Sequence, residues 1–262
     1  NDALANEWYR KAAALGEPRA MANLGAMYAR GEGVRKNDDD AMRWYRQAAE
    51  AGNLRAMTTI GARYASGAAV VRDDAEAVRW YRKAADGGDA DAMFLLGSMY
   101  ARGRGVEHSA NEAFAWRRKA AEAGCARAMT SVGSSYATAM GVSLDHAEAV
   151  RWFKKGVDAG DITAMANLAV AYLDGNGVEK DRAQAMHWLK LSAECGDVAA
   201  MVTLGDMNSR GATSTRNYDE AIRWYARAVE MGHTSAMTSL GVLFSEGKGT
   251  EAKPAEAVRL FL

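Results

Sequence analysis

Hydrophobic residues recur along the chain in pairs of helical stripes separated by short breaks. In residues 17–52 the first stripe has i, i+4, i+8 spacing and consists of Ala20, Met21, Leu24, Gly25 and Tyr28. The run Gly-Glu-Gly-Val at 31–34 then interrupts the pattern. A second stripe follows and ends before Gly52; it contains Ala41, Trp44, Tyr45, Ala48 and Ala49. The pattern predicts two amphipathic helices, here called helix A and helix B, joined by a glycine-containing turn.

The same pair of stripes repeats every 36 residues. All seven tryptophans of the chain follow this period, at Trp8, Trp44, Trp80, Trp116, Trp152, Trp188 and Trp224. An Ala-Met dipeptide recurs with the same period, from Ala20 and Met21 to Ala236 and Met237. A fixed period of this length is typical of solenoids, in which each unit buries its apolar face against its neighbours. The sequence therefore predicts an all-α fold of stacked antiparallel helix pairs.

We expect the whole chain, residues 1–262, to form one repeat domain. Residues 1–16 supply a lone helix B, and residues 233–262 supply a truncated pair. Between them we expect six complete repeats at 17–52, 53–88, 89–124, 125–160, 161–196 and 197–232. The repeating tryptophans are expected in the core, so truncation of a residue such as Trp116 is predicted to cost roughly 3–5 kcal/mol.

Polar residues mark the predicted helix starts. Helix B is preceded by a favoured N-cap residue in six repeats, at Asn37, Asp73, Ser109, Asp145, Asp181 and Asn217. Three positions later stands an acidic residue or glutamine, such as Glu76, which we expect to complete a capping box by accepting the backbone N–H of the cap residue. Helix A has corresponding caps at Asn53, Asp89, Cys125, Asp161 and Asp197, and Pro18 stands at N1 of the first unit.

The charges and cysteines exclude several kinds of partner and bond. Thirty-three basic and 33 acidic residues cancel, so no global field favours nucleic acid or an anionic membrane surface. No apolar run approaches the roughly 20 residues of a membrane helix, so direct membrane insertion is not expected. Cys125 and Cys195 lie at different repeat phases nearly two units apart. We predict that both are free thiols.

No group of residues outside the repeat pattern has the spacing of a catalytic, metal or cofactor site. The four histidines sit at unrelated phases, and the glycine turns lack the Gly-Lys-Ser/Thr signature of a phosphate loop. We therefore expect no enzyme activity and no cofactor. Cys125 leaves two readings open: a cap that acts as serine would, or a thiol made reactive by the helix N-terminus.

The repeat resembles that of the Sel-one-like repeat (SLR) family. The resemblance rests on Ala-Met-x-x-Leu-Gly-x-x-Tyr-x-x-Gly-x-Gly-Val followed by Asp-x-x-x-Ala-x-x-Trp-Tyr-x-x-Ala-Ala-x-x-Gly, matched most fully at residues 20–52 and extending over the whole chain. The family is a branch of the tetratricopeptide-like α-solenoids. It implies a right-handed superhelix, a concave surface lined by helix A, and a role as an adaptor or scaffold.

By this resemblance, selected helix A residues are expected to bind a partner in the concave groove. The expected contact residues are Asn23, Phe94, Asn167, Val170, Leu173, Val202, Asp206 and Val242. A basic rim is expected from Arg19, Arg30, Arg55, Arg102, Arg127 and Arg210. Because arginine pairs bidentately with carboxylates, apolar anchors flanked by aspartate or glutamate would suit this surface.

Three hypotheses about function follow. The first is a non-catalytic scaffold that binds a protein or peptide segment in the groove. The second is an architectural spacer that assembles through its ends or its convex face, including end-to-end self-association. The third is a small-ligand or thiol-based sensor that uses Cys125 or the groove.

Overall fold

The structure is a computed structural model that describes residues 1–210 and 216–249. In these residues the chain forms 14 α-helices and no strand. The B helices are α1 (Asp2–Ala14), α3 (Asp38–Glu50), α5 (Asp74–Asp86), α7 (Ala110–Glu122), α9 (His146–Asp158), α11 (Arg182–Glu194) and α13 (Tyr218–Glu230). The A helices are α2 (Pro18–Arg30), α4 (Leu54–Ser66), α6 (Ala90–Arg102), α8 (Ala126–Thr138), α10 (Ile162–Asp174), α12 (Val198–Ser209) and α14 (Thr234–Glu246). The predicted all-α fold of repeated helix pairs is confirmed.

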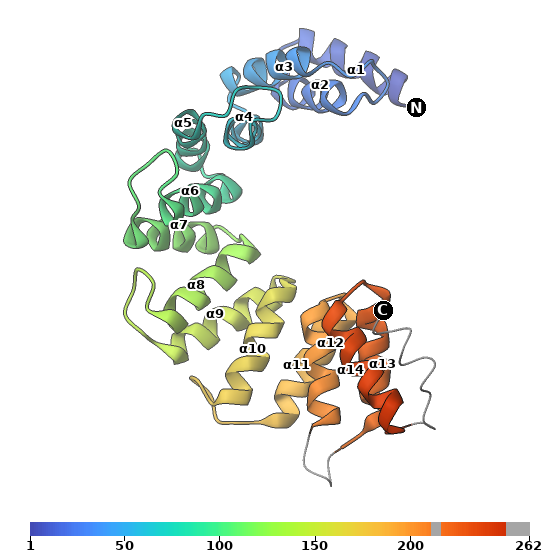
Figure 1. Cartoon of the computed structure of the whole chain (residues 1–262). Helices are drawn as coiled ribbons and strands as arrows, with labels where there is room; N and C mark the ends of the chain where they lie inside the picture. The colour runs from blue at the N-terminus through green and yellow to red at the C-terminus, as the bar shows by residue number, and fades with distance from the viewer. Residues whose placement is uncertain (211–215, 250–262) are drawn as a thin grey trace. The chain divides into compact units, whose positions relative to one another are not determined.

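The chain consists of two compact units, which follow one another along the continuous colour gradient of Figure 1. Unit 1 comprises residues 1–145 with α1 to α8, and unit 2 begins at His146 and contains α9 to α14. Within each unit, helix A packs against helix B of its own repeat, and helix B packs against helix A of the next. This alternation gives each unit one layer of A helices and one layer of B helices.

Glycine on helix A allows the two layers to approach closely. A Cβ atom added to Gly61 of α4 would lie 2.7 Å from Cε1 of Tyr81 of α5, and one added to Gly25 would lie equally close to Cδ1 of Tyr45. The Tyr81 side chain is 3% exposed, and burial raises its pKa to about 12. A ring from helix B therefore packs directly on the backbone of helix A.

The tryptophans are less buried than we expected. Trp152 and Trp224 are 7% and 6% exposed, whereas Trp8 is 61% exposed. The other four, including Trp116, are half-buried. The Nζ atom of Lys119 lies 4.2 Å from the Trp116 ring centroid, so a lysine stem covers a ring that the core does not enclose. The cost of 3–5 kcal/mol predicted for truncation of Trp116 is therefore too high.

Five of the six N-caps predicted for helix B are confirmed, but the reciprocal half of the capping box is not. Side chains of Asn37, Asp73, Ser109, Asp181 and Asn217 accept backbone N–H bonds from the first turn of helix B. The backbone N–H of Asp73 donates instead to the carbonyl of Tyr64, over 3.0 Å, in the last turn of α4. Glu76 is left to accept from Arg79 at 3.0 Å. The expectation was wrong because the preceding helix offers its own unpaired carbonyl to this N–H.

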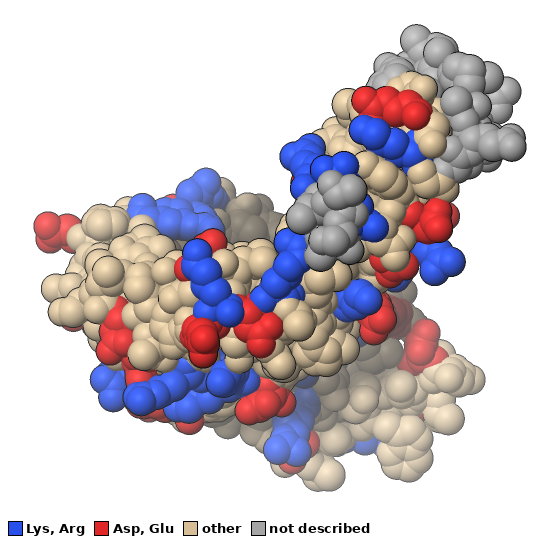
Figure 2. Space-filling model, turned by 90° about the horizontal axis from the view of Figure 1, so that it is seen from below, with Lys and Arg blue, Asp and Glu red and all other residues tan. Residues whose placement is uncertain are grey.

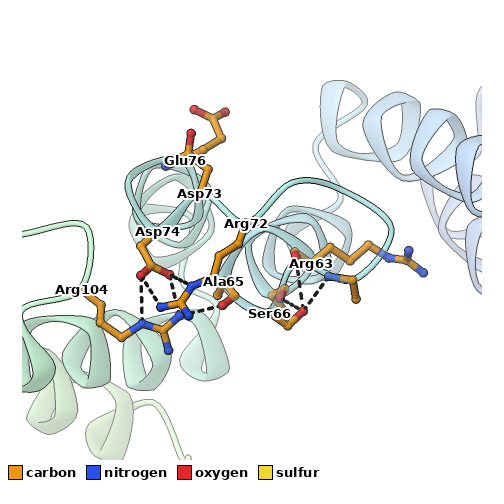
Figure 3. A network of polar contacts seen from close by, with 10 residues as sticks. Arg63, Ala65, Ser66, Arg72, Asp73, Asp74, Glu76 and Arg104 are labelled. Carbon is orange, nitrogen blue, oxygen red and sulfur yellow. Dashed lines mark hydrogen bonds and ion pairs between the residues drawn. The ribbon is translucent and has the colours of Figure 1, made fainter.

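A polar network joins the turn after α6 to the two preceding helices of unit 1 (Figure 3). Asp74, at the start of α5, accepts from Nε of Arg104 at 3.1 Å and from Nη2 of Arg72 at 2.8 Å. Arg104 also donates to the carbonyl of Ala65 in α4, over 2.7 Å. Hydrogen bonds from Arg104 and then Arg72 hold the pKa of the Asp74 carboxyl well below its usual range.

This network makes a pH-dependent contribution to stability. Because the folded state lowers the pKa of Asp74, its contribution is complete above the unfolded pKa of about 3.9 and is lost as the pH falls below that value. We expect Asp74→Asn to lower the melting temperature at pH 7, and the difference from the wild type to shrink near pH 3. Thermal unfolding followed by circular dichroism checks this; an equal difference at both pH values would contradict it.

Candidate functional site

The exposed side of the A helices is built from four positions in each repeat. In α2 these are Arg19, Asn23, Ala26 and Arg30, and their equivalents follow every 36 residues; together they are called the A-face here. The two arginines and Asn23 are exposed, and Ala26 is half-buried. The i, i+4, i+7, i+11 spacing places these residues on one stripe of the helix. The A-face is therefore a continuous feature of the repeat within each unit.

Three of the predicted contact residues lie at the edge of the A-face, towards the next repeat. Val202 is half-buried and packs against the core cluster of unit 2, which includes Leu204 and Leu240. Phe94 is half-buried beneath the guanidinium of Arg127, whose Cζ lies 5.1 Å from the ring centroid. Leu173 is also half-buried. Part of the Val202 and Phe94 side chains therefore contacts a neighbouring repeat.

The remaining predicted residues belong to the A-face itself. Val170 and Val242 are 50% and 41% exposed, although both are large and apolar. Asn23 is exposed and Asn167 is half-buried. Asp206 is half-buried and accepts a hydrogen bond of 2.7 Å from the hydroxyl group of Tyr225. Unit 2 thus presents two exposed valines, at equivalent positions of α10 and α14.

A pocket of about 250 Å³ lies in unit 2 between the end of α12 and α14. Its walls include Arg210, Tyr225, Thr238, Val242 and Glu246. The structure therefore brings together two of the predicted residues, Arg210 of the rim and Val242. It joins them to hydroxyl groups and a carboxylate, which suits a ligand with both apolar and polar parts.

All six predicted rim arginines are exposed, but half of them have acidic partners. These pairs are Arg30 with Glu32 at 2.6 Å, Arg127 with Asp91 at 3.3 Å, and Arg210 with Asp206 at 3.5 Å. In the described part of the chain, Arg19, Arg55 and Arg102 have no ion pair. Exposed pairs contribute little to stability, so the paired arginines can still exchange their partner for a ligand.

The A-faces of the two units carry opposite charge. That of unit 1 holds five basic residues and one acidic residue: Arg19, Arg30, Arg55, Arg102, Arg127 and Asp91. That of unit 2 holds three acidic residues and one basic residue: Asp174, Asp206, Glu246 and Arg210. Basic and acidic side chains are interspersed on the face shown in Figure 2. The zero net charge of the chain conceals this division.

Sequence reasoning missed Arg117 of α7. Its stem packs on α6, since a Cβ added to Gly97 would lie 3.0 Å from Cγ of Arg117. The Nε atom is buried without a hydrogen-bond partner. Burial, and then the nearby charge of Arg102, lowers the pKa of Arg117. The signal was present in the sequence, because the Trp-Tyr dipeptide found at four other repeat positions is Trp-Arg here.

The cysteines are free thiols, as predicted. Cys125 stands at the N-cap of α8 but makes no side-chain cap bond, so it does not act as serine would. Among residues 1–210 and 216–249, no group of histidine, cysteine, aspartate and glutamate is arranged to hold a metal ion. No helix in these ranges is long and apolar enough to cross a membrane.

The comparisons with known proteins agree with the repeat geometry. The Sel1 repeat model matches eight times, at residues 1–17, 18–53, 55–89, 90–125, 126–161, 162–197, 198–233 and 234–262. No curated protein sequence matches the chain.

Two solved structures are similar in both fold and sequence. One is c5321, described as a protective antigen present in uropathogenic Escherichia coli strains and displaying an SLR fold; it is 31% identical with a TM-score of 0.83. The alignment covers 97% of this chain but 55% of the E. coli protein, so this chain spans about half of that relative's length. The other is a Sel1 repeat protein from Oxalobacter formigenes, 36% identical with a TM-score of 0.76, aligned over 82% of this chain and 88% of that one.

A more distant structure shares the fold alone. It is the immunity protein Pa5087 from Pseudomonas aeruginosa, 20% identical with a TM-score of 0.52 over 80% of both chains. Repeat proteins of the Sel1 and tetratricopeptide-like kind are generally protein-interaction scaffolds. From the eight repeat matches and the two similar structures, the chain belongs to the Sel1 repeat family.

Proposed function

We propose that this chain is a non-catalytic scaffold that binds a segment of a partner protein along its A-face. The observation that supports the proposal most directly is the exposure of Val170 and Val242, 50% and 41%, at equivalent places of α10 and α14. Apolar side chains of this size at regular intervals on a rigid surface suit the recognition of an extended segment or an amphipathic helix. Because the helices already hold these side chains in place, little conformational entropy is lost on binding.

The predicted contact residues have different parts in this proposal. Val170 and Val242 act as apolar anchor points, and Asn23 and Asn167 offer amides to a partner backbone. The rim arginines attract acidic groups. Phe94, Leu173 and Val202 contribute only their accessible edges, since all three are half-buried. We further propose that residues 1–262 act together as one repeat domain.

Affinity capture tests the proposal with two matched double variants. We expect Val170→Asp/Val242→Asp to lose the partners that the wild-type chain retains from an extract of its source cells, because charge replaces the apolar anchors. The control is Val71→Asp/Met231→Asp, at two residues that are 89% and 56% exposed and lie outside the helices. The control should retain the same partners.

The readouts distinguish this proposal from the other two hypotheses. Equal capture by both double variants would reject the A-face as the binding surface. A change of oligomeric state in light scattering, with capture unaltered, would favour the architectural spacer. Helical content and melting temperature of each variant should match the wild type, since all four side chains are exposed.

A further inference from the structure

Side chains at the position of Arg117 reach from helix B to the A-face. In unit 2 the equivalent residue is Tyr225, whose hydroxyl donates to Oδ1 of Asp206, a residue of the A-face. In unit 1 the equivalent Tyr45 interacts electrostatically with Arg30. Tyr225 also contacts Ser209, and the residues of α6 that correspond to Asp206 and Ser209 are Ser98 and Ala101, which Arg102 follows directly. The stem of Arg117 packs on Gly97 of the same helix, so this equivalence places its guanidinium at the A-face of unit 1, in the neighbourhood of Arg102.

The carboxylate that would pair with this guanidinium is missing. The residue of α6 that corresponds to Asp206 is Ser98, whose hydroxyl donates to the carbonyl of Phe94 over 3.0 Å. The residue that corresponds to Ser209, the second partner of the Tyr225 hydroxyl at 3.1 Å, is Ala101. In the described residues Arg117 makes no hydrogen bond and no ion pair. Unit 1 thus holds the cation of a pair without its anion.

An unpaired charge in this position is costly. Arg117 is half-buried and its Nε is withdrawn from water, and a buried donor of a charged group is normally hydrogen-bonded or paired because it has lost its hydration. Tyrosine fills the same place in the other three B helices of unit 1, at Tyr9, Tyr45 and Tyr81, so packing alone does not require an arginine there. Arg102 adds a second positive charge and has no ion pair in the described chain. Both observations favour a bound anion as the reason for Arg117.

We propose that Arg117 and Arg102 form a carboxylate-binding site on the A-face of unit 1, which takes an aspartate or glutamate side chain, or a terminal carboxylate, from a bound protein segment. The inference rests on the proposed function and specifies what that surface recognises. The planar guanidinium presents paired N–H donors that match the two oxygens of a carboxylate. The bound carboxylate would take the place beside Arg117 that Asp206 has beside Tyr225. The surplus of arginine on this A-face draws acidic segments towards the site.

The test is an NMR titration of the full chain with three short peptides. The first is a capped pentapeptide of alanines with a central glutamate, the second replaces glutamate with glutamine, and the third is an alanine pentapeptide with a free C-terminal carboxylate. The signals followed are the side-chain Nε–Hε resonance of Arg117 and the backbone amides of Gly97 and Ser98. We expect saturable shifts with the glutamate peptide, the free-carboxylate peptide or both, and none with the glutamine peptide. The response to the two carboxylate peptides identifies the source of the anion.

Variants separate binding at Arg117 from a general attraction of charges. Arg117→Tyr installs the residue that unit 1 already accommodates, and we expect it to weaken peptide binding at least about tenfold, as loss of a charge-assisted hydrogen bond does. The matched control is Arg118→Gln on the same helix, where Arg118 pairs with Glu122 at 2.9 Å and is 55% exposed. It removes the same charge and should leave the affinity unchanged.

Two results would overturn the inference. One is a response to the glutamine peptide that equals the response to both carboxylate peptides, including no response to any of the three, and the other is equal affinity in the wild type and Arg117→Tyr. Either result, combined with loss of partner capture in Val170→Asp/Val242→Asp, would leave the proposed function intact and reject only the carboxylate site.

Discussion

Replacing Trp224 with alanine is expected to lower the free energy of unfolding by about 3–5 kcal/mol. The side chain is 6% exposed and belongs to a core cluster that joins five helices of unit 2, with Leu204, Tyr225 and Leu240 among its members. Its Nε1 atom also donates to Glu220 over 3.1 Å. Truncation removes buried apolar surface and leaves a cavity that α13 cannot close, because helices on both sides hold it in place.

Urea unfolding followed by circular dichroism measures this loss, with Trp8→Ala as the comparison. Trp8 has the same repeat position, but its side chain is 61% exposed and carries Lys11 over its ring at 4.6 Å. A surface substitution of this kind usually changes stability by no more than about 0.5 kcal/mol. Similar losses in the two variants would mean that the repeat position, and not its burial, determines the contribution of the tryptophan.

The second large effect on stability is expected from Gly61→Ala. Whether this substitution stabilises or destabilises the protein depends on the residue that faces Gly61, which is Tyr81. Alanine is favoured over glycine inside a helix by about 1 kcal/mol. Here, however, its Cβ would lie 2.7 Å from the buried ring of Tyr81 and 3.2 Å from the carbonyl oxygen of Ala77. Overpacking of a core costs about 1–3 kcal/mol, so we expect the substitution to be destabilising.

The chain itself indicates how this clash can be relieved. At the equivalent place in unit 2, Ala169 replaces the glycine and Leu189 replaces the tyrosine, and both belong to one core cluster. In a Tyr81→Leu background, Gly61→Ala should therefore be neutral or stabilising. A double-mutant cycle from chemical unfolding tests this reversal. An equal loss in both backgrounds would show that the helix backbone, and not the ring, is the obstacle.

The sequence predicted the helices well because their determinants are local. Each start depends on a cap residue and on apolar spacing, both of which recur every 36 residues from Asn37 to Asn217. The capping box failed for a non-local reason, since a carbonyl from the preceding helix takes the N–H of Asp73. The burial of tryptophan failed similarly, because no pattern in one repeat reveals how far Lys119 covers Trp116.

The candidate site was harder to predict than the fold. Spacing identifies the face of helix A to which Val170 and Val242 belong, and the structure shows both exposed. The spacing of residues does not reveal that Val202 also packs into the core, because that contact depends on the distance between successive helix pairs. Arg117 was overlooked because it lies on helix B, and the search for binding residues followed helix A. The break in the Trp-Tyr pattern at Trp116 was the available clue.

Glycine at Gly25, Gly61, Gly97 and Gly205 lets a helix B side chain pass over helix A. Both helix layers therefore determine which partner such an array binds. Helix A supplies the exposed residues, and helix B supplies charges and hydrogen-bonding groups beneath them. A single substitution on helix B, such as tyrosine to arginine, can change what the surface recognises while every residue of helix A stays the same. Related repeat proteins with identical A helices can thus differ in their partners.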